Sequence, residues 1–477
     1  MPNATHSFSR FVRGFLYLTP RLLFVFLIAY APLAYGITRV APRNYFNQVA
    51  LAAFVVFLIS YVVQRRWPRL PLLPLTCLVL LNLQGWWMTF NAHTFHLYNG
   101  GMEFIRMWGN PFFHQLPGSI DRAISLDYML NFSAITGLLL MFFAFDARWK
   151  FRLLASIVIV AAIFSVGGIA IKIIGPDAQE LLWGDQLKSL ETIFFTYRYH
   201  ANAAAFLYLG LAVNLGFVWS SFLGKASESG RAAWILSALL IAAALMLNTS
   251  RGGWVIGLAI LLLSSIWAGV LFFRNRTEDS RSGIAGLKRS VAILCFAIAV
   301  AAPFYLSWQF RSNRLEGAIV QLQDRYPTQL FKAMARDTPR EGFGPGAFSL
   351  AFLPYGQTYP KLLPVGSEGK FWNAAHQDYY QTFFEWGRTG SFVWGFFIII
   401  GIVRRPEVFN PGSKGTTAQV SAFRVSILAG LLGYLAHSLY DFPFNTPSLF
   451  FLFLLLLAFS YSELNEPGSD RDVPANV

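Results

Sequence analysis

The chain of 477 residues is 55% hydrophobic and only 13% charged, and it contains 47 Phe and 14 Trp. Soluble domains carry about 25% charged residues, so this composition excludes a soluble multidomain enzyme, and the aromatic content excludes disorder, collagen and a coiled coil. The formal charge of +14 is typical of basic residues that flank membrane spans, and it does not indicate binding to nucleic acid. The composition therefore indicates a polytopic membrane protein.

Long apolar runs follow one another along most of the chain. A helix needs about 20 apolar residues to cross the roughly 30 Å hydrocarbon layer of a bilayer. By this criterion the sequence predicts an all-α membrane protein with roughly twelve transmembrane helices. The expected spans are 20–38, 45–63, 70–90, 123–145, 153–174, 199–223, 232–247, 254–273, 291–309, 388–402, 423–440 and 447–463.

The spans divide the chain into four regions. Residues 1–309 hold the first nine helices, and residues 388–463 hold the last three. Residues 310–387 are the one large segment expected outside the membrane, and their glycine, proline, aromatic and charged residues predict short amphipathic helices. The polar residues 464–477 predict a flexible tail.

Lysine and arginine are concentrated in alternate connections between the spans, for example at 148–152 and 274–289. Under the positive-inside rule these connections face the cytoplasm. Both termini are then expected in the cytoplasm, and the large loop 310–387 is expected on the opposite side of the membrane.

The residue types that hold metals and redox centres are sparse. Cys77 and Cys295 lie within separate apolar runs, so they form neither a CxxC pair nor a disulfide framework. The seven histidines are scattered without the spacing of metal ligands. We therefore expect no metal and no cofactor.

A very short turn, Asn-Thr-Ser-Arg-Gly-Gly at 248–253, separates two spans on the predicted outer side. An arginine near hydrocarbon is costly and needs an anionic partner or water. Arg251 can therefore pair with a headgroup or a carboxylate, or it can hold a phosphate group of a substrate. In the second case Gly252 and Gly253 would let a large ligand approach the backbone.

His376 lies near the end of the large loop and is followed by Gln377 and Asp378. Neutral imidazole accepts a proton readily near pH 7, and Asp378 or Glu385 could orient the ring. A lone histidine at a membrane interface can equally be a structural residue that is held by hydrogen bonds.

Three more polar segments are predicted on the same side. Arg198 and Asn202 lie where the span 199–223 begins, residues 340–346 form a glycine-rich loop, and Asp441 follows the span 423–440, where it can pair with an arginine. The glycine-rich loop lacks the GK[ST] of a phosphate-binding Walker motif. Arginines, a histidine and carboxylates beside the one large loop together predict a functional site.

These segments resemble the O-antigen ligase and polymerase superfamily of bacterial envelope glycosyltransferases. The resemblance is carried by Tyr-His-Ala-Asn-Ala-Ala-Ala-Phe at 199–206, Thr-Ser-Arg-Gly-Gly-Trp at 249–254, Gly-Phe-Gly-Pro-Gly-Ala-Phe at 342–348, His376-Gln377 with Gly387 and Gly390, and His-Ser-Leu-Tyr-Asp-Phe-Pro at 437–443. The spacing from His376 to Gly-x-x-Gly is the most specific of these features. The resemblance covers about residues 195–463, and the first third of the chain matches in hydropathy alone.

The resemblance implies a multi-pass glycosyltransferase of the bacterial inner membrane that acts at the periplasmic face in lipopolysaccharide biosynthesis. It would move a glycan from an undecaprenyl-diphosphate-linked donor to a hydroxyl of lipid A-core, of another glycan or of a protein, with inversion and without a metal. By this resemblance Arg251 and Arg325 would bind the donor diphosphate, and His376 would deprotonate the acceptor. The supporting residues would be Arg198, Asn202, Gln377, Asp378 and Asp441, and the alternatives to Arg325 are Arg311, Arg314 and Arg336.

Two other classes of function compete with this interpretation. A transporter of an anion or of a lipid-linked oligosaccharide needs charge at mid-depth, and Lys172 is the main charge inside a predicted span. A structural assembly protein needs no reactive groups at all. A transferase instead needs its charges gathered at the outer rim of the bundle.

Overall fold

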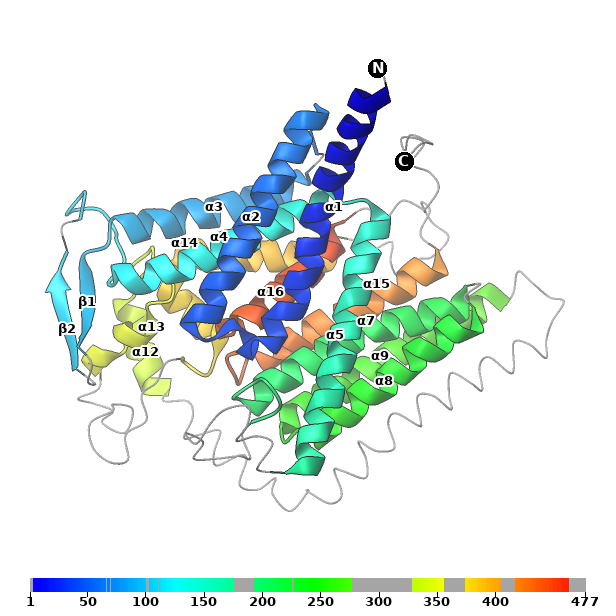
Figure 1. The fold of residues 1–477 in the computed structure, drawn as a ribbon. Coiled ribbons are helices and arrows are strands. Elements are labelled where there is room, and N and C mark those ends of the chain that lie inside the picture. The colour runs from blue at the N-terminus through cyan, green and yellow to red at the C-terminus, as the bar shows by residue number, and fades with distance from the viewer. Residues whose placement is uncertain are drawn as a thin grey trace, which may run out of the picture.

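The computed structural model describes residues 3–65, 67–68, 70–99, 103–109, 111–175, 193–224, 227–276, 328–355, 374–404 and 417–462. Within these residues, 10 helices are long and apolar enough to cross a membrane. Each corresponds to a predicted span, the predicted span 447–463 forms a shorter apolar helix, and the span 291–309 lies outside the described residues. The chain is therefore a helical, membrane-embedded protein (Figure 1).

The helices long enough to span a bilayer are α1 (Asn3–Leu33), α2 (Val40–Gln64), α3 (Leu72–Phe90), α4 (Arg122–Ala144), α5 (Ala147–Ile174), α7 (His200–Leu223), α8 (Glu228–Leu247), α9 (Arg251–Arg276), α14 (Asp378–Val403) and α15 (Ala418–His437). The shorter elements are η1 (Tyr35–Ile37), β1 (Thr94–Asn99), β2 (Glu103–Trp108), α12 (Thr328–Asp337), α13 (Phe348–Ala351), η4 (Leu353–Tyr355), η7 (Pro443–Asn445) and α16 (Pro447–Tyr461).

Short connections, such as 145–146 between α4 and α5 and 248–250 between α8 and α9, make successive helices run in opposite directions. The end of the bundle that carries β1, β2 and the first residues of α7, α9 and α14 is named the hairpin end (Figure 1). The opposite end carries basic residues that the sequence assigns to one face, namely Arg148, Arg152, Arg231, Arg274 and Arg404.

Helix α16 lies in the centre of the bundle (Figure 1). Its sequence, PSLFFLFLLLLAFSY, is apolar on every side, which is typical of a helix buried within a protein. Phe451 packs against Phe24 of α1 and Phe46 of α2, and aromatic contacts also join α16 to α4, α5, α14 and α15. Because other helices enclose it, α16 need not match the thickness of a bilayer, and it has only 15 residues.

Helix α14 is interrupted at Gly387, where φ is 62° and ψ is −164°. The interruption separates a first helical segment, 378–386, from a second, 388–403. The sequence predicted a membrane helix that starts at residue 388, and this start is wrong for α14, which begins at Asp378. The predicted boundary between loop and membrane helix therefore falls at the break inside one helix.

Residues 340–344 supply the hydrogen-bond partners that the interrupted helix lacks. Backbone amides and carbonyls inside a bundle must be paired, so an unwound turn needs another segment of chain beside it. The pairs are Phe343 N to Phe384 O at 2.8 Å, Gly344 N to Glu385 O at 3.0 Å and Arg388 N to Arg340 O at 2.8 Å. From α3, Gln84 Nε2 adds hydrogen bonds to the carbonyls of Glu341 and Trp386 at 3.1 and 2.9 Å.

Two glycines make this close approach possible. A Cβ atom on Gly387 would lie 2.2 Å from Arg340 O, and a Cβ atom on Gly342 would lie 2.3 Å from Glu385 O. Both residues also have positive φ values, 62° and 89°, which glycine adopts without strain. The glycine-rich loop 340–346 is thus bound to α14 through its backbone.

Helices α12 and α13 pack with the first segment of α14 in a small apolar core at the hairpin end. Helix α12 buries Leu330, Phe331 and Met334 and exposes Lys332 and Arg336. The described part of 310–387 thus contains the amphipathic helix α12 and the short helix α13, which hold the start of α14 against residues 340–346.

Residues 91–99, 103–109 and 111–121, between α3 and α4, lie outside the helices. Strands β1 and β2 pair there in antiparallel register, from Thr94 opposite Trp108 to Asn99 opposite Glu103. The segment joins the glycine-rich loop where Ile120 N donates to Phe343 O at 2.9 Å. The sequence analysis did not predict this hairpin, because short strands leave no long apolar run.

We expect Gly387→Ala to destabilise the protein strongly. The new Cβ would meet Arg340 O and would force alanine into a left-handed conformation, at a total cost of about 2–5 kcal/mol. The measurement is the thermal unfolding of the purified protein in detergent. Gly395→Ala is the matched control in the same helix, because a Cβ there has nothing within 4 Å. Equal melting temperatures for the two variants would contradict the role assigned to Gly387.

Candidate functional site

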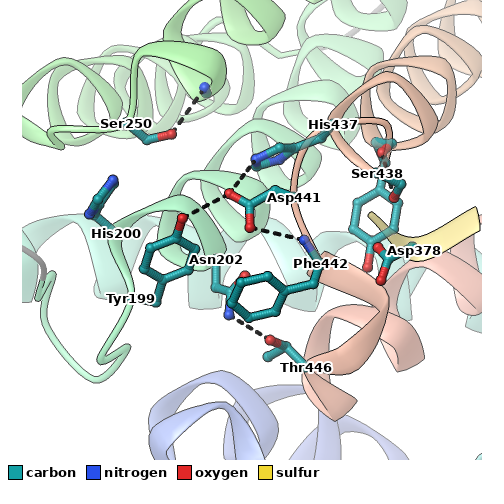
Figure 2. Close-up of polar contacts among 12 residues, drawn as sticks. Tyr199, His200, Asn202, Ser250, Asp378, His437, Ser438, Asp441, Phe442 and Thr446 are labelled. Atoms are coloured by element: carbon teal, nitrogen blue, oxygen red, sulfur yellow. Dashed lines mark hydrogen bonds and ion pairs between the residues drawn. The ribbon is translucent and has the colours of Figure 1, made fainter. Parts of the chain in front are cut away.

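Four segments that are far apart in the sequence meet at the hairpin end. They are residues 199–202 at the start of α7, 248–253 between α8 and α9, 376–378 at the start of α14, and 437–446 after α15 (Figure 2). The contacts that join them are Tyr199 OH to Asp441 Oδ2 at 3.0 Å, Asn248 Nδ2 to His200 O at 3.0 Å, Asp378 N to Ser438 O at 3.1 Å and Asn202 Nδ2 to Thr446 Oγ1 at 2.6 Å. The sequence predicted that these segments share one end of the bundle, and their contacts confirm that they do.

The turn 248–253 is ordered by its own polar groups. Asn248 Oδ1 accepts a hydrogen bond from Ser250 N at 2.8 Å, and Trp254 Nε1 donates to Asn248 O at 2.9 Å. The Ser250 hydroxyl accepts from Gly253 N at 3.2 Å and so caps the N-terminus of α9. These bonds make the half-buried Arg251 the first residue of α9.

The space beside the two glycines after Arg251 is occupied by other residues of the protein. A Cβ on Gly252 would lie 2.5 Å from Tyr440 OH, and a Cβ on Gly253 would lie 2.4 Å from the Cβ of Ala204. The expectation that these glycines leave the backbone open to a large ligand is therefore wrong. They allow α9 to pack closely against α7 and against the residues that follow α15.

His376 occupies a strained backbone conformation, with a φ of 54°. Its Nδ1 lies 3.1 Å from the carbonyl oxygen of Ala374, and because a carbonyl can only accept, Nδ1 must carry the proton. In the neutral ring the lone pair is then on Nε2. The ring meets the Phe442 ring edge-on, with centroids 4.7 Å apart.

Arg251 and His376 both lie beside the segment 437–442. Gly252, next to Arg251, contacts Tyr440, while His376 contacts Phe442. The two residues are therefore not on opposite sides of the bundle. Opposite positions would have excluded a common site.

The carboxylates predicted to orient His376 are engaged with other groups. Asp378, which is buried, accepts a hydrogen bond from Phe444 N at 3.0 Å. Glu385 accepts from Gln381 Nε2 at 3.0 Å and from Phe348 N at 3.4 Å, so it holds α13. Their roles in the described structure are to tie α14 to its neighbours.

Asp441 is the centre of the buried polar network (Figure 2). Its Oδ1 accepts from Phe442 N at 2.9 Å, and its Oδ2 accepts from Tyr199 OH and lies 3.7 Å from His437 Nε2, in contact but beyond hydrogen-bond distance. The sequence suggested an arginine as its partner, and the structure replaces that partner with His437 and Tyr199. The spacing of four residues between His437 and Asp441 was the signal in the sequence that could have found this pair.

Two groups beside this network have shifted pKa values. Burial alone would raise the pKa of the Asp441 carboxyl, but the contact with His437 and the Phe442 amide outweigh burial, so this pKa lies below the ordinary value for aspartate. Burial, together with the charge of Asp441, raises the pKa of Tyr440 to about 12. Both shifts favour an ionised Asp441 beside a neutral Tyr440 near neutral pH.

The other predicted site residues have simpler positions. Arg198 is exposed on the turn before α7, Asn202 is buried, and Gln377 caps α14 by accepting a hydrogen bond from Tyr380 N at 3.1 Å. Arg325 lies outside the described residues, as do Arg311 and Arg314, while the alternative Arg336 is exposed on α12. In the described part of the chain, no three His, Cys, Asp or Glu side chains are grouped as metal ligands.

Comparison of the chain with protein-family models, with curated proteins and with solved structures finds no match. The fold and the site define the class of protein as a helical membrane protein with a buried ionisable network at one end of its bundle. Function is therefore inferred from the chemistry of these residues and from the resemblance of the motifs.

We expect Asp441→Asn to change how stability depends on pH. Because the folded protein lowers the pKa of Asp441, the ionised carboxylate stabilises the fold above about pH 4, and this contribution disappears as the pH falls through the folded pKa. Asp441→Asn should melt at a lower temperature than the unmodified protein at pH 7, and the difference should shrink at pH 3–4. A difference in melting temperature that stays constant between these pH values would contradict the assignment.

Proposed function

We propose that this chain is an integral-membrane glycosyltransferase that moves a glycan from an undecaprenyl-diphosphate-linked donor to a hydroxyl acceptor at the periplasmic face of the bacterial inner membrane. The observation that carries the proposal is the meeting of the four segments at the hairpin end, where Arg251 and His376 both lie beside 437–442. These are the segments in which the sequence resembles the O-antigen ligase and polymerase superfamily.

The donor side of the reaction needs stabilised negative charge. When the bond between the anomeric carbon and the diphosphate breaks, charge accumulates on the leaving group. Arg251 is the first residue of α9, so its guanidinium adds to the positive end of a helix of 26 residues. This combination suits a diphosphate, and a second arginine such as Arg325 would increase the effect.

The acceptor side of the reaction needs a base. His376 has its lone pair on Nε2, which can take the proton of an incoming hydroxyl as the new glycosidic bond forms. Attack from the face opposite the leaving diphosphate would invert the anomeric centre. The positive φ of His376 is the kind of backbone strain that often accompanies a functional residue.

The position of Lys172 weakens the transporter alternative. In the sequence this lysine is the main charge within a predicted span, and a transporter would need a charge there. In the structure Lys172 lies in the last turn of α5, at the hairpin end of the bundle. Lys172 therefore does not supply the charge at mid-depth on which the transport hypothesis was based.

We expect Arg251→Ala to reduce glycan transfer by roughly 10²–10³-fold and His376→Asn by roughly 10²–10⁴-fold. Asparagine is chosen because it tolerates the left-handed backbone of residue 376 better than alanine does. The measurement is transfer of a lipid-linked glycan by the purified protein in detergent, with melting temperatures as the check on folding. Lys332→Ala, on the exposed face of α12, is the control and should keep full activity.

If both site variants fold and transfer glycan at the rate of the unmodified protein, the proposed function is wrong. The acceptor can be identified by deleting the gene and separating the envelope polysaccharide on a gel. Loss of all chains from lipid A would indicate a ligase, and chains with a single repeat would indicate a polymerase. Unchanged lipopolysaccharide would point to another acceptor, such as a protein hydroxyl.

A further inference from the structure

We propose that two residues buried beneath the site, His437 and Tyr208, are positioning residues that hold Asp441 and, through Asp441, set the position and the proton affinity of His376. The proposal deepens the proposed function, because it takes His376 as the base of the transfer. His437 and Tyr208 lie inside the bundle, with exposed fractions of 1% and 0%, so neither can touch a substrate.

The buried chain of contacts begins at α7. Tyr208 OH lies 3.0 Å from His437 Nδ1, and on the other side of the ring His437 Nε2 lies 3.7 Å from Asp441 Oδ2. If the tyrosine donates to Nδ1, the proton of the neutral imidazole is on Nε2 and faces the carboxylate. In that arrangement, Tyr208 selects the tautomer of His437 whose Nε2–H faces Asp441.

Asp441 connects the buried pair of Tyr208 and His437 to the aromatic residues around His376. Its two oxygens hold Tyr199 OH and Phe442 N, and the Tyr199 and Phe442 rings stack at 5.3 Å with an interplanar angle of 6°. The His376 ring rests edge-on against the same Phe442 ring (4.7 Å). A change in the direction of the Asp441 carboxylate would therefore move the surface on which His376 rests.

Asp441 and His376 contact the same residue, Phe442, one at its amide and the other at its ring, so the charge of Asp441 also acts on His376. A carboxylate beside an imidazole favours the protonated ring. The titratable groups around Asp441 come from three elements. Tyr208 lies in α7 and Tyr199 directly before it, and His437 ends α15 while Tyr440 follows it. Asp378 begins α14, and His376 lies two residues before it. Arg251 starts α9, and its neighbour Gly252 lies beside Tyr440.

The first test measures His376 and needs no enzymatic activity. Diethylpyrocarbonate reacts with neutral histidine, so the rate of carbethoxylation of His376, followed by mass spectrometry from pH 5.5 to 8, reports the pKa of this ring. In Asp441→Asn we expect a midpoint lower by at least about half a pH unit, because an opposite charge has been removed. A midpoint that does not move would overturn the electrostatic part of the proposal.

The second test uses a matched pair at residue 437. The amide of His437→Gln reaches the place of Nε2 and can keep an N–H group facing Asp441, whereas the amide of His437→Asn reaches only the place of Nδ1, beside Tyr208. We expect the asparagine variant to lower kcat by on the order of 10²-fold with little change in KM, and the glutamine variant to lose far less. The midpoint of His376 should follow the same order.

Tyr208→Phe is the third variant, and it keeps the shape of the side chain in case the changes at 437 impair folding. It should lower kcat without raising KM. If Tyr208→Phe and both variants at 437 match the unmodified protein in kcat and in the His376 midpoint, the positioning role is wrong. Failure of the proposed function is a separate result, because it appears as full activity of Arg251→Ala and His376→Asn.

Discussion

The arrangement of the hairpin end depends on one constraint: the backbone of an interrupted helix must find hydrogen-bond partners. The break at Gly387 leaves amides and carbonyls of α14 unpaired, and residues 340–344 pair with them. The same residues are bonded to α3 through Gln84 and to the segment before α4 through Ile120. One interruption in a helix therefore joins α14, α3, the segment before α4 and the loop into a single unit.

This unit explains how the start of α14 is placed. The first segment, 378–386, is held by α12 and α13 on one side and by Ser438 and Phe444 on the other. His376, two residues before it, is thereby held against Phe442. The backbone thus sets the position of His376, and the buried network around Asp441 adds a negative charge near it.

The sequence predicted the membrane helices well, because length and hydropathy alone determine whether a segment can cross a bilayer. It also predicted which polar segments share one end, since that follows from counting spans. It did not predict the start of α14, because residues 378–386 are stabilised by packing against α12 and α13 and by no apolar run of their own. The partner of Asp441 and the neighbours of Gly252 were missed for a related reason: they come from other helices, and no local pattern contains them.

The central position of α16 has a consequence for biosynthesis. The ribosome makes this helix after every other described helix, yet its aromatic contacts reach α1, α2, α4, α5, α14 and α15. Earlier helices that have left the translocon must therefore wait in a loosely packed state until α16 enters between them. A nascent chain that stops before residue 447 would lack its centre, and membrane proteases would be expected to remove it.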